Sequence, residues 1–188
     1  MEIQAADTGY NKFQGVKRRF FALRNGVISN ALRSSGSPFK IIFGLTYPQL
    51  QEIALWSGPD KELSEQLRAD SSTRECHLLA PLIYPIDSLT KEIAEEWLSS
   101  ENNPEVIDIF CHSLLRKVFF APQMAIELLE ASYTSDITLY KALRLCLNCF
   151  SSIDRVRFST ALRRIRGNAL ESTLNTQLFN QLNELLES

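Results

Sequence analysis

The chain has 188 residues, of which 45% are hydrophobic and 22% are charged, and its formal net charge is −2. These values predict a single folded domain over residues 1–188 and exclude an intrinsically disordered chain. Every apolar run is shorter than the roughly 18 residues of a membrane-spanning helix, and residues 1–9 lack the apolar stretch of a secretory signal. We therefore expect a cytoplasmic protein that has no membrane partner.

Apolar residues recur at helical spacing along most of the chain, and the alternation typical of strands is missing from the sequence. The first stretch, from Phe13 to Ala31, predicts one long helix that ends near Gly36. Thr46 and Gln49 have the spacing of a capping box and predict the start of a second helix, and a third is expected over 63–68.

The remaining helices follow at short intervals. A fourth is predicted over 73–84, and a fifth runs to Trp97 from Asp87, which is a candidate N-cap. The sixth is expected to begin at Pro104 and to end near Phe120. Pro122 begins a seventh, and the last three are predicted over about 136–151, 154–166 and 174–186.

About ten helices joined by short loops predict an all-α fold built from antiparallel helical hairpins. The pairs recur every 35–45 residues or so, which is the range of HEAT-like repeats. Such repeats stack side by side, so that their inner helices line one concave surface.

The four cysteines all fall inside predicted helices, which indicates buried, reduced thiols rather than a disulfide framework. Cys146 and Cys149 form a C-x-x-C pattern that no second pair accompanies. The sequence has no glycine-rich phosphate loop and no Ser/His/Asp arrangement. We therefore expect neither a metal site nor a cofactor.

Several short segments resemble the AlkD-like DNA alkylation repair family, most closely its short bacterial members, over about residues 20–150. They are 25–28, 40–45 with 48–50, 73–75 with 78–81, and 105–108 with 111–112. The resemblance implies a right-handed superhelix of HEAT-like pairs with a basic concave groove for duplex DNA. It also implies glycosylase activity on cationic N-alkylated purines such as 7-methylguanine and 3-methyladenine.

In active family members an aspartate on an inner helix stands near the lesion, four residues after a tryptophan. Asp108 is the position that matches this aspartate, and Pro104 stands where the tryptophan would be. On a helical wheel, Asp108 shares a face with Glu105, His112 and Arg116, opposite an apolar face. This stripe is interpreted either as a catalytic carboxylate with neighbours that tune it, or as a solvated helix face with an Asp108–His112 pair.

Basic residues gather in the last third of the sequence, where residues 137–170 hold seven bases and one acid. Their stripes on the eighth and ninth helices predict contacts to DNA phosphates. With the sixth helix, the candidate DNA-binding residues are His112, Arg116, Lys141, Arg144, Arg155, Arg163 and Arg166. The alternatives are that these stripes keep the surface soluble, or that a non-catalytic helical scaffold binds a protein partner with the same face.

Overall fold

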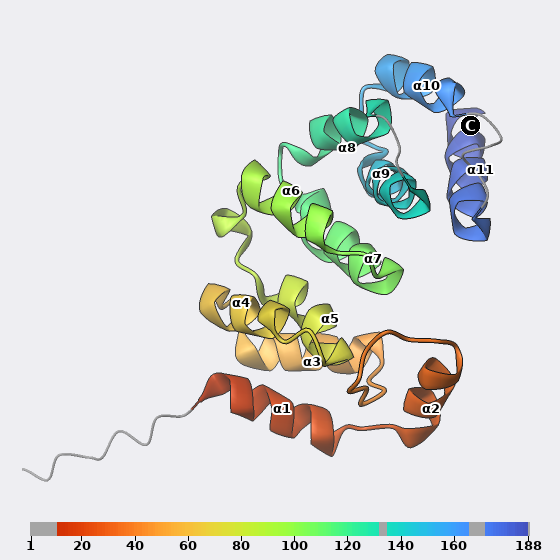
Figure 1. Cartoon of the computed structure of the whole chain (residues 1–188). Helices are drawn as coiled ribbons and strands as arrows, with labels where there is room; N and C mark the ends of the chain where they lie inside the picture. The colour runs from red at the N-terminus through yellow and green to blue at the C-terminus, as the bar shows by residue number, and fades with distance from the viewer. Residues whose placement is uncertain (1–10, 132–134, 166–171, 188) are drawn as a thin grey trace, which may run out of the picture. The chain divides into compact units, whose positions relative to one another are not determined.

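The computed structural model describes residues 11–131, 135–165 and 172–187, and these residues form an all-α structure (Figure 1). Eleven α-helices and two short 3-10 helices account for its regular structure within those ranges. Among the described residues, β-type hydrogen bonding is limited to one isolated bridge, between Ile41 and Thr73. The chain divides into two compact units, one that ends at Tyr84 and one that begins at Pro85. The prediction of an all-α chain is confirmed.

The described part of the N-terminal unit contains five helices around a small apolar core. α5 packs against both α3 and α4, and α1 packs against the same two helices (Figure 1). Val16 and Phe20 of α1 are fully buried in this core. The helices are α1 (Lys12–Ala22), α2 (Gly26–Ser34), α3 (Tyr47–Ser57), α4 (Lys61–Ala69) and α5 (Arg74–Ile83).

A fully buried carboxylate at the start of α5 fixes the loop that precedes α3. Glu75 accepts hydrogen bonds from the backbone amides of Phe43, Gly44 and Leu45, at 3.0, 2.9 and 3.3 Å. Arg74 also donates to Glu75 over 2.9 Å, and it donates to the carbonyl oxygen of Leu45. The buried charge is thus surrounded by donors, which is the condition under which a protein interior tolerates it.

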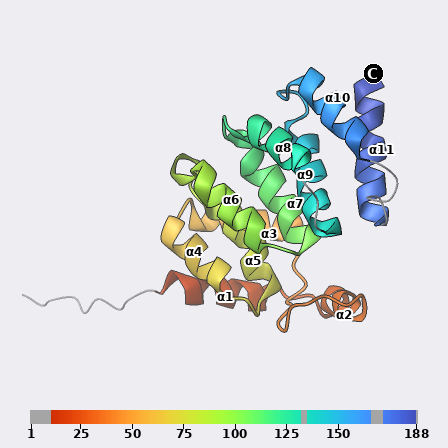
Figure 2. The same cartoon turned by 45° about the horizontal axis from the view of Figure 1, so that its top comes forward.

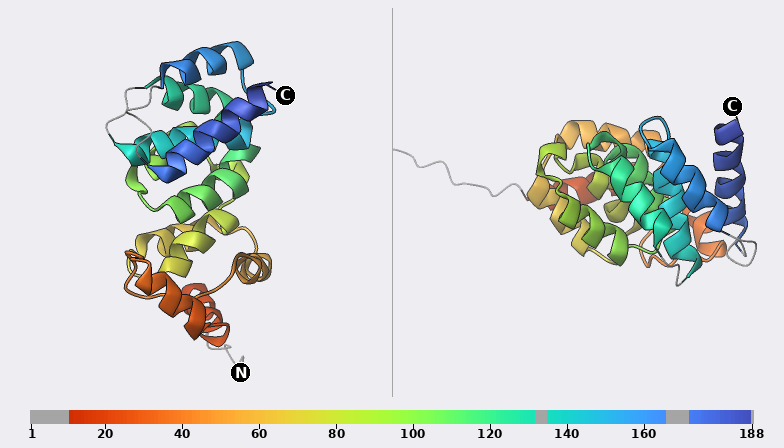
Figure 3. Two further views of the ribbon diagram at one scale, coloured as in Figure 1. Left: turned by 90° about the vertical axis from the view of Figure 1, so that its right-hand side faces the viewer. Right: turned by 90° about the horizontal axis from the view of Figure 1, so that it is seen from above.

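The described part of the C-terminal unit contains six α-helices, and the contacts of five of them form two layers. α7 and α11 both pack against α9, whereas α8 packs against α10 (Figures 1 and 2). α8 and α9 also pack against each other and join the two layers. A view from another side shows α11 lying across α9 (Figure 3). The helices are α6 (Lys91–Ser100), α7 (Pro104–Ser113), α8 (Ala121–Glu130), α9 (Asp136–Cys149), α10 (Arg155–Arg164) and α11 (Thr173–Glu187).

The prediction of one long first helix is wrong, because the chain breaks between α1 and α2. The side chain of Asn25 accepts hydrogen bonds from the amides of Val27 and Ile28, so it caps a new helix. Its own amide donates to the carbonyl oxygen of Phe43 at 2.8 Å. Apolar spacing alone did not reveal this break, because the periodicity continues across it.

The expected N-cap at Asp87 is also wrong. Asp87 lies in a 3-10 helix, Ile86–Ser88, and the cap of α6 is Thr90, whose side chain accepts from the amide of Ile93. The predicted capping box of Thr46 and Gln49 is confirmed at the start of α3. Ser135 forms a second capping box with Thr138 at the start of α9.

The sixth helix was expected to continue to Phe120, but α7 ends at Ser113 and a 3-10 turn, Leu115–Lys117, follows it. Leu115 is fully buried. A continued helix would place this residue seven positions after Asp108, on the same polar face. Ending the helix lets Leu115 reach the core, and it removes Arg116 from the predicted stripe.

The four cysteines are free and buried, as predicted. Burial raises the pKa of the thiols, for Cys149 to about 11 and for Cys76 to about 12. Among the helices of the described ranges, none has the length and apolar character needed to cross a lipid bilayer.

Candidate functional site

A carboxylate, a phenol and a guanidinium meet between α7 and α9 of the C-terminal unit. The hydroxyl of Tyr140 donates to Oδ1 of Asp108 at 2.5 Å, and Nη2 of Arg144 donates to Oδ2 at 2.8 Å. The same Nη2 also donates to the Tyr140 oxygen at 3.1 Å. Nε of Arg144 lies 2.5 Å from Oδ1, as an ion pair without an aligned hydrogen bond. These contacts define the Asp108 cluster, which consists of Asp108, Tyr140 and Arg144.

The local sequence explains why Asp108 points to α9. Asn103 caps α7 by accepting from the amides of Glu105 and Val106, and Pro104 occupies the first turn, where it costs no hydrogen bond. Val106 and Phe110 lie on the opposite side and are buried. Phe110 stacks on Trp97 of α6, with ring centroids 4.5 Å apart. With its apolar side fixed in the core, α7 presents Asp108 on the other side.

Burial and polar contacts act in opposite directions on the Asp108 cluster. Burial raises the pKa of Asp108 above its ordinary value, while the hydrogen bond from Tyr140 and the charge of Arg144 partly offset this effect. Burial and the bond to Asp108 together raise the pKa of Tyr140 to about 12, so the phenol stays protonated and remains a donor at neutral pH. The Asp108 side chain keeps 38% of its surface exposed, so part of this acidic side chain remains accessible to solvent.

His112 and Arg116 of the predicted stripe do not join this cluster. His112 is exposed on α7, and Arg116 is exposed in the turn that follows the helix. The contacts to the Asp108 oxygens come from α9, instead of from His112 one turn along the same helix. Asp108 is therefore part of an interaction between helices, which the helical wheel of a single segment did not indicate.

The predicted DNA-binding residues occupy different environments. Lys141 is 6% exposed, its Nζ lies 3.4 Å from the carbonyl oxygen of Ser99, and burial lowers its pKa, although Glu101 opposes the effect. Arg155 is exposed and lies over the ring of Phe150, with 3.7 Å from Cζ to the ring centre. Arg163 is exposed near the end of α10, and Arg166 lies outside the described residues.

A pocket of about 440 Å³ lies beside α10, and both Arg155 and Arg163 line it together with Ser159 of the same helix and Asn183 and Glu187 of α11. α10 packs on α8, whereas Asp108 and Arg144 belong to the layer of α7 and α9. The structure therefore brings Arg144 to Asp108 and groups Arg155 with Arg163 on a separate helix.

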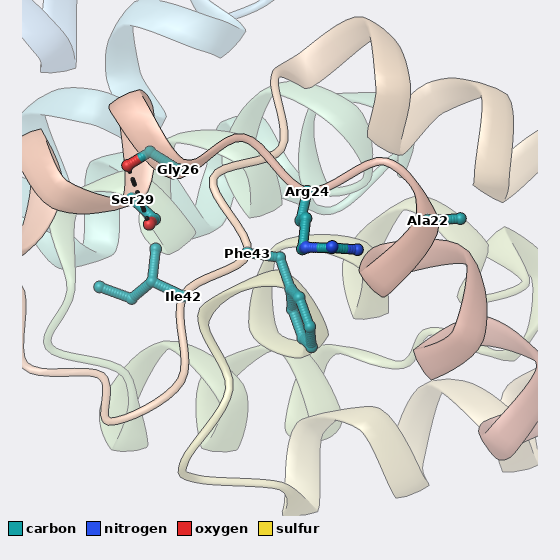
Figure 4. A pocket seen from close by; sticks show the side chains of 6 residues that line it. All are labelled: Ala22, Arg24, Gly26, Ser29, Ile42 and Phe43. Carbon is teal, nitrogen blue, oxygen red and sulfur yellow. Dashed lines mark hydrogen bonds between the residues drawn. The ribbon is translucent and has the colours of Figure 1, made fainter.

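The N-terminal unit has a pocket of about 410 Å³ between the end of α1 and the start of α2 (Figure 4). Arg24 and Phe43 line it, with Ser29 and Ile42 on another side. The Arg24 guanidinium already donates to the carbonyl oxygen of Phe21 at 2.8 Å and lies over the Phe21 ring. The hydroxyl of Ser29 is bonded to the carbonyl oxygen of Gly26. Both polar groups thus have partners within the unit.

Sequence reasoning missed Tyr140 as a partner of Asp108. The sequence does place Tyr140 on the same helix face as the candidate residue Arg144, because the two are four residues apart. No sequence pattern indicated which helix this face would meet. In the described part of the chain, no three His, Cys, Asp or Glu side chains gather in a manner that would hold a metal ion.

Comparisons with known proteins give no relative for this chain. No family model, no curated protein and no solved structure matches it.

Proposed function

We propose that this chain is an AlkD-like DNA alkylation repair protein that binds duplex DNA and excises cationic N-alkylated purines. The fold proposed with this function is a right-handed superhelix of HEAT-like pairs with a basic concave groove. The observation that supports the proposal most directly is the Asp108 cluster, because it fixes a part-exposed carboxylate at the position that matches the family's aspartate.

The chemistry suits a fixed carboxylate. Alkylation gives the purine a positive charge, so the base leaves as a neutral molecule when the N-glycosidic bond breaks. The sugar left behind has oxocarbenium character, and water then adds to its C1′ carbon and loses a proton. A carboxylate near this carbon stabilises the developing cation and orients the water. Asp108 would supply that charge.

Tyr140 and Arg144 would act as positioning residues in this mechanism. Tyr140 binds Oδ1 and Arg144 binds Oδ2 of the carboxylate, and together they hold it in a single orientation, so that it need not reorganise during the reaction. Both also favour its ionised form and thereby oppose the effect of burial on its pKa. The exposed part of the carboxylate would then face the sugar.

DNA binding would use the exposed cations of this unit. Arg116, Arg155 and Arg163 are exposed, and each can contact a phosphate through several donors. Binding by such contacts releases counterions, so the affinity for duplex DNA should fall steeply as salt increases.

A second function is favoured by the same cluster. Both oxygens of Asp108 already have partners, as in an ion pair that only joins two helices, and Pro104 replaces the family's tryptophan. Under this alternative the chain is a non-catalytic helical scaffold that binds a protein partner. The exposed side chains of Leu55 and Trp56 would then be candidates for that interface.

One assay separates the two functions. The full chain is incubated with duplex DNA that contains 7-methylguanine, and free methylpurine is measured by chromatography. We expect release by the native chain and its loss in Asp108→Asn. Glu127→Gln is the matched control, because Glu127 pairs with Lys91 between α6 and α8 and should not affect release. If the native chain neither releases methylpurine nor binds duplex DNA at low salt, the repair function is excluded and the scaffold remains.

A further inference from the structure

The segment that joins α7 to α8 exposes an aromatic ring. Phe119 is 94% exposed, and no other large apolar side chain in the described ranges is more exposed. Phe120 meets it in an edge-on arrangement, with ring centroids 5.5 Å apart and an interplanar angle of 84°. A ring left in water costs free energy, so such exposure marks a candidate contact surface.

Two cations lie two and three residues before this ring in the sequence. Arg116 and Lys117 are both exposed, and neither has an ion-pair partner among the residues that the structure describes. The side chains on either side of them, Leu115 and Val118, are buried. The segment is therefore anchored by its apolar residues, and it presents two positive charges and one aromatic ring to solvent.

Another aromatic ring and another cation, Phe150 and Arg155, lie at the same end of the C-terminal unit. Asp108 contacts Tyr140 and Arg144, and Cys111 lies near the thiols of Cys146 and Cys149. The later residue of α7 therefore lies near the later residues of α9, so the two helices run in the same direction. Their C-terminal ends therefore lie at one end of the unit, where Arg155 covers the ring of Phe150.

We propose that this end of the C-terminal unit binds single-stranded nucleic acid. An unpaired base would stack on Phe119, and the neighbouring phosphates would contact Arg116 and Lys117. Aromatic rings next to cations form such sites, because every base has a π-face and every nucleotide carries a phosphate. The site shares Arg116 with the proposed duplex contacts, but it does not require the Asp108 chemistry.

The small exposed apolar area of this segment favours single-stranded nucleic acid over a lipid surface as the partner. Membrane binding by a peripheral segment needs a broad apolar face or an acyl chain. Here one ring is exposed, while Leu115 and Val118 point into the core. One exposed ring gives a base a full stacking surface but gives a bilayer little apolar contact.

The test uses the full chain and a labelled single-stranded DNA of about 12 nucleotides with a central 2-aminopurine. Fluorescence anisotropy gives the dissociation constant, and 2-aminopurine emission reports stacking. We expect Phe119→Ala to weaken binding by about 5- to 100-fold and to abolish the stacking signal, and Phe119→Trp to retain both. Leu55→Ala is the matched control, because Leu55 is 84% exposed in the other unit, and it should change neither.

Salt dependence and vesicles complete the test. Lys117→Gln should reduce the slope of log affinity against log salt by about 0.7, the value for one lost contact to a single strand. Asp108→Asn should leave this binding unchanged, so failure of the repair function would not count against it. The proposal is overturned if the native chain does not bind the oligonucleotide at low salt, or if Phe119→Ala binds as well as the native chain. It is also overturned if Phe119→Ala weakens binding to phosphatidylserine vesicles but leaves binding to the oligonucleotide unchanged.

Discussion

Tyr140 donates its phenolic hydrogen to Asp108 over 2.5 Å, although the two residues are 32 positions apart and lie on different helices. Arg144, one turn further along α9, reaches the other carboxylate oxygen. The two donors therefore align α9 with α7 as well as holding the carboxylate. The same contacts would serve catalysis and the packing of neighbouring helices, and substitutions within the cluster can separate these roles.

The first prediction concerns the phenol. Tyr140→Phe removes a donor that favours ionised Asp108, so the pKa of Asp108 should rise further. The lost hydrogen bond should lower the free energy of unfolding by about 1 kcal/mol. NMR titration of the Asp108 carboxyl carbon measures the pKa, and urea unfolding measures stability.

The pH dependence of this effect has a definite sign. A carboxyl whose pKa is higher in the folded chain than in the unfolded chain makes stability fall as pH rises through that interval. The interval widens in Tyr140→Phe, so its stability should fall more steeply with pH than that of the native chain. In an Asp108→Asn background the substitution should have little further effect on this slope. An unchanged Asp108 pKa would show that the hydrogen bond is not formed in solution.

The second prediction concerns Gly44, which has a φ of +78°. A Cβ atom there would lie 2.4 Å from the carbonyl oxygen of Asn25 and 2.8 Å from the amide nitrogen of Ser29. Gly44→Ala combines this overlap with a left-handed backbone, so we expect a loss of about 3 kcal/mol or more in thermal or urea unfolding.

Two other glycines are internal controls for Gly44. Gly36 has a φ of +84° but open space around it, so Gly36→Ala should cost about 1 kcal/mol from backbone strain alone. Gly26 begins α2 in open space, and Gly26→Ala should leave stability unchanged or raise it by up to about 1 kcal/mol. Equal effects at Gly44 and Gly36 would contradict the close approach of Gly44 to α2.

The third prediction concerns the buried charge at the start of α5. Glu75→Gln keeps the size of the side chain but removes the negative charge that Arg74 and three backbone amides bind. We expect a loss of about 3 kcal/mol in the free energy of unfolding, because a broken buried ion pair leaves its partner uncompensated. The loop amides should also exchange with solvent faster, which hydrogen exchange measures at Gly44 and Leu45. Glu65→Gln on the exposed face of α4 should change neither quantity.

Sequence patterns predicted those parts of the fold that depend on neighbouring residues. The helical class, the Thr46 capping box and the buried cysteines all follow from local spacing, and the structure confirms them. The break at Asn25 and the early end of α7 depend on distant contacts, to Phe43 in one case and to the core through Leu115 in the other. Local periodicity does not contain that information.

The same distinction applies to the candidate site. The wheel of the sixth predicted helix placed Asp108 on a polar face, but its partners lie on α9, and no sequence spacing specifies that pairing. Glu75 is a second example. It lies in the first turn of α5, a position that on its own indicates only an interaction with the helix dipole. The structure instead buries it completely against a loop about 30 residues earlier in the chain.

The fourth prediction concerns acid stability. Asp70 forms an ion pair with Lys17 and accepts from the hydroxyl of Ser72 at 2.6 Å and from that of Thr73 at 3.2 Å. Burial works to raise the pKa of Asp70, but the Lys17 and Ser72 hydrogen bonds outweigh it and hold the pKa well below its ordinary value of 3.8. A carboxyl with a lowered folded-state pKa contributes stability above its unfolded pKa, and this contribution is lost as pH falls.

The native chain should therefore lose stability as pH falls from about 5 toward 2, and Asp70→Asn should flatten this part of the curve. At neutral pH the substitution should cost about 2 kcal/mol, since it removes hydrogen bonds to a charged group. Lys17→Met should also flatten the stability curve between about pH 5 and pH 2, because the pKa of Asp70 then returns toward its ordinary value. Urea unfolding at a series of pH values measures both effects. If Asp70→Asn keeps the acid slope of the native chain, another carboxyl is responsible for it, and the Lys17–Asp70 pair is not maintained in solution.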